Sequence, residues 1–280
     1  MPFWRRATIT PGNALLTFTL ASSHSISAMK NSDSFAKGAD SFAKGVDSFA
    51  RDADSFAKGV DSFARGVDSS LGDSVRGIPF ERVVILHGYG ATPADHWFPW
   101  LTRAVPGAEA VELPRPQSPE AASWILAATD AIGPLSRKTA VVTHSLGGLA
   151  ALRAIQRLVK RGAAQARARG GASCDAQLGA LVAVAPFACE LPLAGDDDVD
   201  RFILSQLPNF LSKNPFPNPR VFGRATVIRS DDDPFVPAGS SEEFAARIGA
   251  RTLTVHGAGH FLASDGVTEL PEVLEALSAA

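Results

Sequence analysis

The sequence is poor in cysteine: Cys174 and Cys189 are the only two thiols among 280 residues. Both fall in stretches that lack a helical or strand pattern, where we expect loops. Two cysteines cannot build a disulfide framework, nor a zinc site with four thiolate ligands. We therefore expect free thiols in the reducing environment of the cytoplasm.

An excess of basic charge and long apolar runs are also missing. The 27 Lys and Arg residues are balanced by 29 Asp and Glu residues, so the charge pattern of a nucleic-acid-binding protein is absent. No run of about 18 apolar residues occurs, and we expect no transmembrane helix. Arg5 and Arg6 precede the apolar patch Ala14–Ala21, which resembles a weak signal peptide. Export is therefore the alternative to a cytoplasmic location.

Residues 33–67 consist of five tandem heptads of the type D-S-F-A-K-G-V. Phenylalanine recurs every seven residues from Phe35 to Phe63 and alternates with Ala or Val at four-then-three spacing, which is typical of a coiled-coil seam. Glycine, present in four of the five units, costs about 0.8–1 kcal/mol at each helical position. Two interpretations stay open. The arm is a helix for self-association or for a protein partner, or it is a disordered or marginally helical product of an expanded coding repeat.

The composition divides the chain into three parts. We expect a poorly ordered segment at residues 1–32, a non-globular repeat arm at 33–77 and a folded domain at 78–280. In this domain, strands are predicted at Arg82–Leu86, Ala110–Leu113, Ala140–Thr143, Ala180–Ala185, Ala225–Ile228 and Arg251–Val255. Helices are predicted at Asp95–Ala104, Pro119–Ile132, Gly148–Val159, Ser241–Ile248 and Leu270–Leu277. Such alternation predicts an α/β fold with a doubly wound, mainly parallel sheet.

Two stretches interrupt this alternation. Lys160–Gln177 is rich in Ala, Gly and Arg, and we expect it to be a surface excursion. Glu190–Pro219 contains several Asp and Pro residues and lies where a cap over a pocket is expected. A helix is predicted within it at Val199–Leu211, as part of a cap or as a simple connection.

A serine stands between a predicted strand and a predicted helix in the segment Val141–Leu149. This context is typical of a nucleophile elbow, in which a strained turn lifts the serine hydroxyl above the sheet. Gly147 provides the small residue that close packing needs on one side, whereas Thr143 replaces the usual first glycine of G-x-S-x-G. A serine N-cap for a following helix would give the same pattern. We favour Ser145 as the nucleophile.

The segment His87-Gly88-Tyr89-Gly90 directly follows the first predicted strand. In enzymes built on a nucleophile elbow, a loop after an earlier strand supplies one oxyanion-hole amide, and the residue after the nucleophile supplies the other. We therefore expect the backbone N–H groups of Tyr89 and Leu146 to form the oxyanion hole.

Two later segments supply a candidate acid and a candidate base. Residues 231–233 are three aspartates after a predicted strand; Asp233 is favoured and Asp232 is the alternative, although all three would also suit a solvated turn. His260 follows the last predicted strand, and the other histidines are interpreted as structural. The order Ser145, Asp233, His260, with each residue after a strand, is the order of the Ser-Asp-His hydrolases. Such a triad needs no metal and no organic cofactor.

Five segments together resemble the small serine hydrolases of the α/β-hydrolase fold, typified by YdeN and by the retinoblastoma-binding serine hydrolase. These segments are His87–Gly90, Asp95–Leu101, His144–Gly148, Asp232–Pro237 and Gly259–Phe261. Trp97 and Trp100 lie three residues apart and are expected to pack inward, in a structural role. The resemblance covers residues 81–277; residues 1–77 have no counterpart in that family.

These observations predict a carboxylesterase-like serine hydrolase that acts on a small-molecule ester or amide. An acyl-enzyme would form on Ser145, with His260 as base and Asp233 as the orienting acid. The alternative is a catalytically silent binding module of the same fold, whose repeat arm recruits a partner or joins copies of the chain. The departure at Thr143 and the repeat favour this second interpretation.

Overall fold

The computed structural model describes residues 77–170 and 177–278. The N-terminal segment, all but the last residue of the repeat arm, and Cys174 lie outside the described residues. Predictions about them, self-association included, stay predictions, as does the domain boundary near residue 78. Among the described residues, no helix is both long and apolar enough to cross a membrane.

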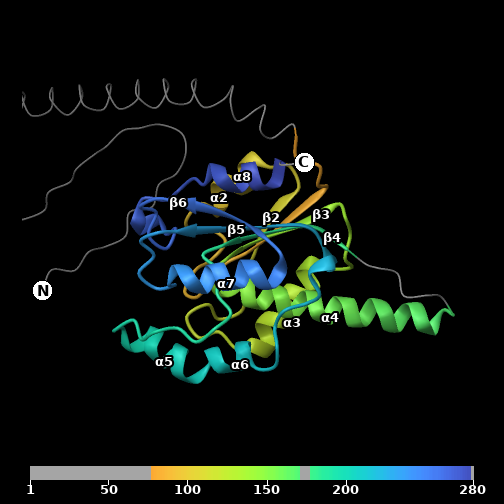
Figure 1. Ribbon diagram of the computed structural model, residues 1–280, viewed down its shortest axis with the longest axis horizontal. Coiled ribbons are helices and arrows are strands. Elements are labelled where there is room, and N and C mark those ends of the chain that lie inside the picture. Colours follow the sequence, from red (N-terminus) through yellow and green to blue (C-terminus); the bar gives the residue numbers. More distant parts are fainter. Residues whose placement is uncertain (1–76, 171–176, 279–280) are drawn as a thin grey trace, which may run out of the picture. The chain divides into compact units, whose positions relative to one another are not determined.

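Six parallel strands form one sheet in the order β2-β1-β3-β4-β5-β6 (Figure 1). The strands are β1 (Arg82–Leu86), β2 (Ala108–Val111), β3 (Thr139–His144), β4 (Leu178–Val184), β5 (Phe222–Ser230) and β6 (Arg251–Val255). The chain steps outward from β1 to β2, returns past β1 to β3 and continues to β6. The predicted doubly wound parallel sheet is therefore confirmed, with β2 two residues earlier than predicted and β5 longer.

The inner strands β1, β3 and β4 are buried on both faces, whereas the edge strands β2 and β6 are partly exposed, and β1 illustrates why a buried strand is a continuous apolar run. Val84 and Leu86 pack into the core on one face of the sheet, whereas Val83 and Ile85 pack into the core on the other. Successive side chains of a strand point to opposite faces, so a strand covered on both sides needs an apolar residue at every position.

Helices cover the two faces of this sheet (Figure 1). They are α2 (Phe98–Ala104), α3 (Ala121–Ile132), α4 (Leu146–Ala168), α7 (Ala238–Ile248) and α8 (Pro271–Ser278). Helices α5 (Asp197–Ser205) and α6 (Leu207–Leu211) lie farther from the sheet, and α6 packs on α3 and α4 (Figure 1). Phe98 of α2 and Val273 of α8 belong to the core that contains Val83. Trp124 of α3 and Phe244 of α7 belong to the opposite core, together with the first half of α4.

The prediction of a surface excursion from Lys160 was wrong for its first half. Helix α4 continues without a break to Ala168. Ala and Arg, which dominate this stretch, are strong helix formers, and they outweigh the single Gly162. Composition alone does not separate an exposed helix from a loop, because both are polar.

The cap segment, residues 190–219, contains two short helices where one was predicted. Helix α5 starts at an N-cap, Asp196, whose side chain accepts the N–H groups of Asp198 and Val199. It ends at Gln206, and α6 then begins with a proline in its first turn, which cannot continue the preceding hydrogen-bond ladder. Phe202 is the only buried residue of α5.

The parallel register brings the carboxyl ends of the strands to one edge. Leu86 pairs with Thr143, His144 with Val184 and Ser230 with Val255. The loops that follow β1, β3, β5 and β6 therefore meet at this edge, where open α/β sheets bind their ligands.

Candidate active site

Ser145 occupies a sharp turn between β3 and α4. Its φ of 52° and ψ of −123° are strained for a residue with a side chain. Its N–H donates a 2.9 Å hydrogen bond to the carbonyl of Val184 on β4, which ties the turn to the sheet. The turn has the conformation predicted for a nucleophile elbow.

Glycine is required two residues after this serine. A Cβ on Gly147 would lie 2.5 Å from the carbonyl oxygen of Leu86 and 2.6 Å from that of His87. On the other side of the elbow, Thr143 fits within β3 and is fully buried, although its hydroxyl has no hydrogen-bond partner in the described part of the chain. The departure from the G-x-S-x-G pattern is thus accommodated inside the core.

Side chains from three different loops form a continuous hydrogen-bonded chain at the sheet edge. The Nε2 of His260 lies 3.0 Å from the hydroxyl oxygen of Ser145, and its Nδ1 lies 2.7 Å from a carboxylate oxygen of Asp233. All three are shielded from solvent: Ser145 is 8% and His260 7% exposed, and the Asp233 side chain is 4% exposed. The sequence predicted that these three residues meet, and the structure brings them together.

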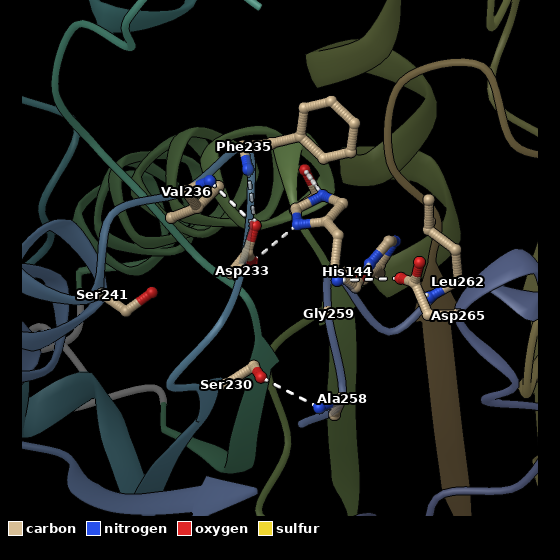
Figure 2. A network of polar contacts seen from close by, with 12 residues as sticks. His144, Ser230, Asp233, Phe235, Val236, Ser241, Ala258, Gly259, Leu262 and Asp265 are labelled. Carbon is tan, nitrogen blue, oxygen red and sulfur yellow. Dashed lines mark hydrogen bonds and ion pairs between the residues drawn. The ribbon is translucent and has the colours of Figure 1, made fainter. Parts of the chain in front are cut away.

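Asp233 is held by backbone groups as well as by the histidine. Figure 2 shows its second oxygen accepting the N–H groups of Phe235 and Val236, each at 2.9 Å. These bonds fix the direction of the carboxylate. Its other oxygen accepts at Nδ1, which places the imidazole proton there and leaves Nε2 free to face the serine.

The two aspartates that precede Asp233 also reach the loop after β6. Asp231 binds the His256 ring at 2.6 Å and the Gly257 N–H at 3.0 Å. Asp232 accepts the Ser230 hydroxyl at 2.5 Å and the Gly259 N–H at 2.8 Å. These hydrogen bonds lower the pKa of both carboxyl groups. Asp231 and Asp232 are exposed, as in a solvated turn, and they also connect the β5 loop to the β6 loop.

Asp265, which the sequence did not single out, holds the backbone on either side of the histidine. One of its carboxylate oxygens accepts the N–H of His260 at 2.8 Å and that of Leu262 at 3.0 Å (Figure 2). A Cβ on Gly259 would lie 2.7 Å from the Asp265 carboxyl carbon, so the glycine makes room for this contact. The glycine before His260 was the only local signal of this arrangement.

The loop after β1 is fixed by His87. The Leu113 N–H donates to Nε2 of His87 at 3.0 Å, so in the neutral ring Nδ1 carries the proton and donates to the Gly88 carbonyl at 2.9 Å. Burial lowers the pKa of His87 and so favours this neutral form. The Gly88 carbonyl faces the His87 ring, and the C=O and N–H of a trans peptide point in opposite directions. The Tyr89 N–H therefore points away from His87.

His144 precedes the serine and packs against the histidine of the site. Its Nε2 donates to the His260 carbonyl at 2.8 Å, and the two ring centroids lie 4.9 Å apart. Burial, followed by the neighbouring His260, holds the pKa of His144 well below its ordinary value of 6.5. Trp97, predicted to be structural, is fully buried and contacts the same ring edge-on. His144 is thus a neutral support for the His260 backbone.

A cavity of about 190 Å³ opens beside Ser145. Its walls come from the loop after β1, the turn at Ser145, the cap segment and the two loops that carry Asp233 and His260, and most of its surface is apolar. The lining residues are Tyr89, His144, Ser145, Leu146, Phe187, Leu191, Pro192, Leu193, Ala194, Val199, Phe202, Ile203, Pro234, Phe235, Val236, His260 and Leu262. Within residues 77–170 and 177–278, no group of three His, Cys, Asp or Glu side chains is placed to hold a metal ion.

Comparison with known proteins identifies the family of this chain. The family model described as serine hydrolase matches residues 83–279. The chain belongs to the serine hydrolase family. As a member of this family, it is 31% identical over 205 residues to YdeN of Bacillus subtilis (strain 168), an alignment that covers 71% of this chain and 95% of YdeN. The resemblance identified from the sequence is confirmed.

Solved structures extend the comparison to the fold of this serine hydrolase. The crystal structure of the ydeN gene product from B. subtilis has a TM-score of 0.57 and 30% identity, and the match covers 71% of this chain and 97% of that one. A YdeN-like protein from Pectobacterium atrosepticum has a TM-score of 0.53 and 16% identity, with 75% and 96% covered. The α/β-hydrolase fold is therefore shared.

Proposed function

We propose that this serine hydrolase cleaves a small carboxylic ester or amide through an acyl-enzyme on Ser145. One observation carries the proposal: the unbroken hydrogen-bonded chain from the Ser145 hydroxyl through the His260 imidazole to the Asp233 carboxylate. A serine, a base and an orienting acid in this geometry are the parts that acyl transfer needs.

In the first half of the reaction, the Ser145 oxygen attacks the substrate carbonyl carbon while Nε2 of His260 takes the hydroxyl proton. The Asp233 carboxylate stabilises the resulting imidazolium without itself taking the proton. The oxyanion accepts hydrogen bonds from the N–H groups of Tyr89 and Leu146. Leu146 suits this role because the first N–H groups of a helix have no intrahelical acceptor.

In the second half, the imidazolium donates its proton to the leaving alcohol or amine, which departs and leaves the acyl group on Ser145. A water molecule then attacks the acyl carbon and transfers a proton to Nε2 of His260. Collapse of the second tetrahedral intermediate returns that proton to the serine and releases the carboxylic acid. All proton transfers pass through a single nitrogen, so no further acid or base is required.

The test is labelling of the full chain with a fluorophosphonate probe, together with hydrolysis of p-nitrophenyl acetate. We expect wild type to be labelled and active, and Ser145→Ala to lose the label and on the order of 10⁵-fold or more in kcat. Ser123→Ala, at a partly exposed position of α3 that does not line the cavity, is the control and should keep both properties. A folded wild type that is neither labelled nor active would refute the proposal and favour the catalytically silent binding module.

A further inference from the structure

The cavity beside Ser145 has no positively charged wall. Among its lining residues, all within the described part of the chain, there is no Lys and no Arg, and the polar side chains other than Ser145 are Tyr89, His144 and His260. A carboxylate that entered this cavity would lose its water without gaining an ionic partner. Burial of an unpaired charge is among the most expensive steps in binding.

Negative charge lies close to the cavity on the cap segment. The carboxylates of Asp198 and Asp196 act on the Tyr89 hydroxyl and, after the larger effect of burial, raise its pKa. Arg201, the nearby basic residue that opposes them, is paired with Asp198 at 2.7 Å. The field on this side of the cavity therefore repels anions.

Two aromatic rings mark different sides of the cavity. Phe202 of α5 stacks against Tyr89 of the oxyanion loop with 4.9 Å between ring centroids, whereas Phe235 contacts the His260 ring at 5.3 Å. In acyl transfer the leaving group departs beside the histidine that protonates it, while the acyl group stays on the serine. If the proposed function holds, Phe235 borders the leaving group and Phe202 borders the acyl group.

The volume limits the size of the acyl group. At a share of about 30 Å³ for each water-sized group, the 190 Å³ cavity has room for roughly six non-hydrogen atoms. An acetyl group would leave most of the cavity empty, and a twelve-carbon chain would extend beyond it.

We propose that the acyl group of the substrate is uncharged and apolar, with about four to six carbons, and that Phe202 sets the upper limit of its length. The inference rests on the proposed function, because it assigns the cavity to the group that stays on Ser145. It makes the cap segment a specificity element for neutral acyl groups.

The first test measures kcat/KM for p-nitrophenyl esters from acetate to dodecanoate. Because each buried methylene contributes about 0.8 kcal/mol, the four methylenes added from acetate to hexanoate should raise kcat/KM by up to roughly two-hundredfold, and the value should then fall by dodecanoate. The monoglutarate ester, which matches pentanoate in carbon number but carries a terminal carboxylate, should react at least a hundredfold more slowly than pentanoate. Equal rates for this pair, or a maximum at acetate, would overturn the inference.

Variants on one helix then test Phe202. Phe202→Ala should move the preferred acyl chain to longer lengths by two carbons or more, and Phe202→Trp should shorten it. Leu204→Ala is the matched control, since Leu204 lies on the same helix and is 69% exposed. Alcohol-length preference, measured with butyrate esters, should stay the same in both Phe202 variants; a shift there, or an unchanged acyl preference in the folded variants, contradicts the assignment.

The two proposals fail in different ways. If Ser145 is labelled and acetate is hydrolysed, but chain length and charge have no effect, the acyl-pocket inference is wrong and the proposed function stands. If the wild type is neither labelled nor active on any ester, both are wrong.

Discussion

The carboxyl edge of the sheet and the cap segment differ in how their side chains are held. At the edge, Asp233 accepts the N–H groups of Phe235 and Val236. Asp265 accepts those of His260 and Leu262. In the cap, Asp196 likewise accepts two N–H groups, but they belong to its own helix, and only Phe202 of that helix is buried. Asp233 also contacts the His260 ring and Asp232 accepts the Gly259 N–H, so the edge joins segments far apart in the chain, whereas the hydrogen bonds of Asp196 stay within its own helix. Substitutions at the edge should alter rate and stability, whereas substitutions in the cap should alter selectivity.

The largest effect is expected at the acid. Asp233→Asn keeps the shape of the side chain but removes the charge that fixes the histidine tautomer, and kcat should fall by about 10⁴-fold. The measurement is steady-state hydrolysis of p-nitrophenyl butyrate, with circular dichroism to verify folding. Asp231→Asn serves as the comparison, because Asp231 binds His256 at the surface. Equal losses in the two variants would mean that the Asp233 contact has no special role.

Gly147 and Gly162 both lie on α4, but the first is packed closely against the β1 region and the second faces open space. Substituting each glycine compares these two environments. Gly147→Ala would force a Cβ against two carbonyl oxygens of the β1 region and should lower the free energy of unfolding by about 3 kcal/mol. Gly162→Ala meets no atom within 4 Å and should raise it by up to about 1 kcal/mol, since alanine favours the helix. Urea titration of both variants measures the difference. Similar stabilities would show that α4 does not need its close approach to β1.

Asp265 at the edge and Asp196 in the cap each accept two backbone N–H groups. Substituting each of them tests directly whether the edge controls rate and the cap controls selectivity. Asp265→Ala leaves the N–H groups of His260 and Leu262 without their acceptor, and kcat should fall by about tenfold. Asp196→Ala removes an N-cap worth about 1 kcal/mol to α5 and should weaken acyl-length discrimination while kcat for acetate stays close to wild type. The readout is kcat and chain-length profile side by side. A reversed pattern would assign rate to the cap and selectivity to the edge.

The smallest expected effect is a loss of folding stability at acidic pH that arises from buried histidines at the carboxyl edge of the sheet. Burial holds the pKa values of His87, His96 and His144 below 6.5, so the unfolded chain binds protons more readily than the folded one. The stability from these neutral rings is fully present above pH 6.5 and is lost as pH falls below it. His144→Gln, which keeps a donor for the His260 carbonyl, should make this loss shallower. Thermal unfolding from pH 5 to pH 8 measures the slopes, and equal slopes in wild type and variant would contradict the prediction.

Local patterns predicted the parts of this protein that depend on neighbours along the chain. All six strands were predicted to within a few residues, and the inner strands most clearly, because a strand buried on both faces must be apolar throughout. The strand-turn-helix context and Gly147 located Ser145, and the order of serine, acid and base pointed to Asp233 and His260. The helical extension of α4 was missed because its exposed, polar residues carry no apolar period.

What the amino-acid sequence determined by itself is the fold class, the family and the three side chains that meet at the sheet edge. Only the tertiary structure decided how the surroundings of these side chains are held. Asp265 accepts the N–H of His260, and His144 donates to the His260 carbonyl. The Leu113 N–H donates to Nε2 of His87 and so places the proton of that ring on Nδ1. These partners come from loops far apart in the chain, or from a residue with no periodic pattern of its own. A hydrogen bond depends on distance and direction in space, and folding brings together groups whose relation no local sequence pattern records.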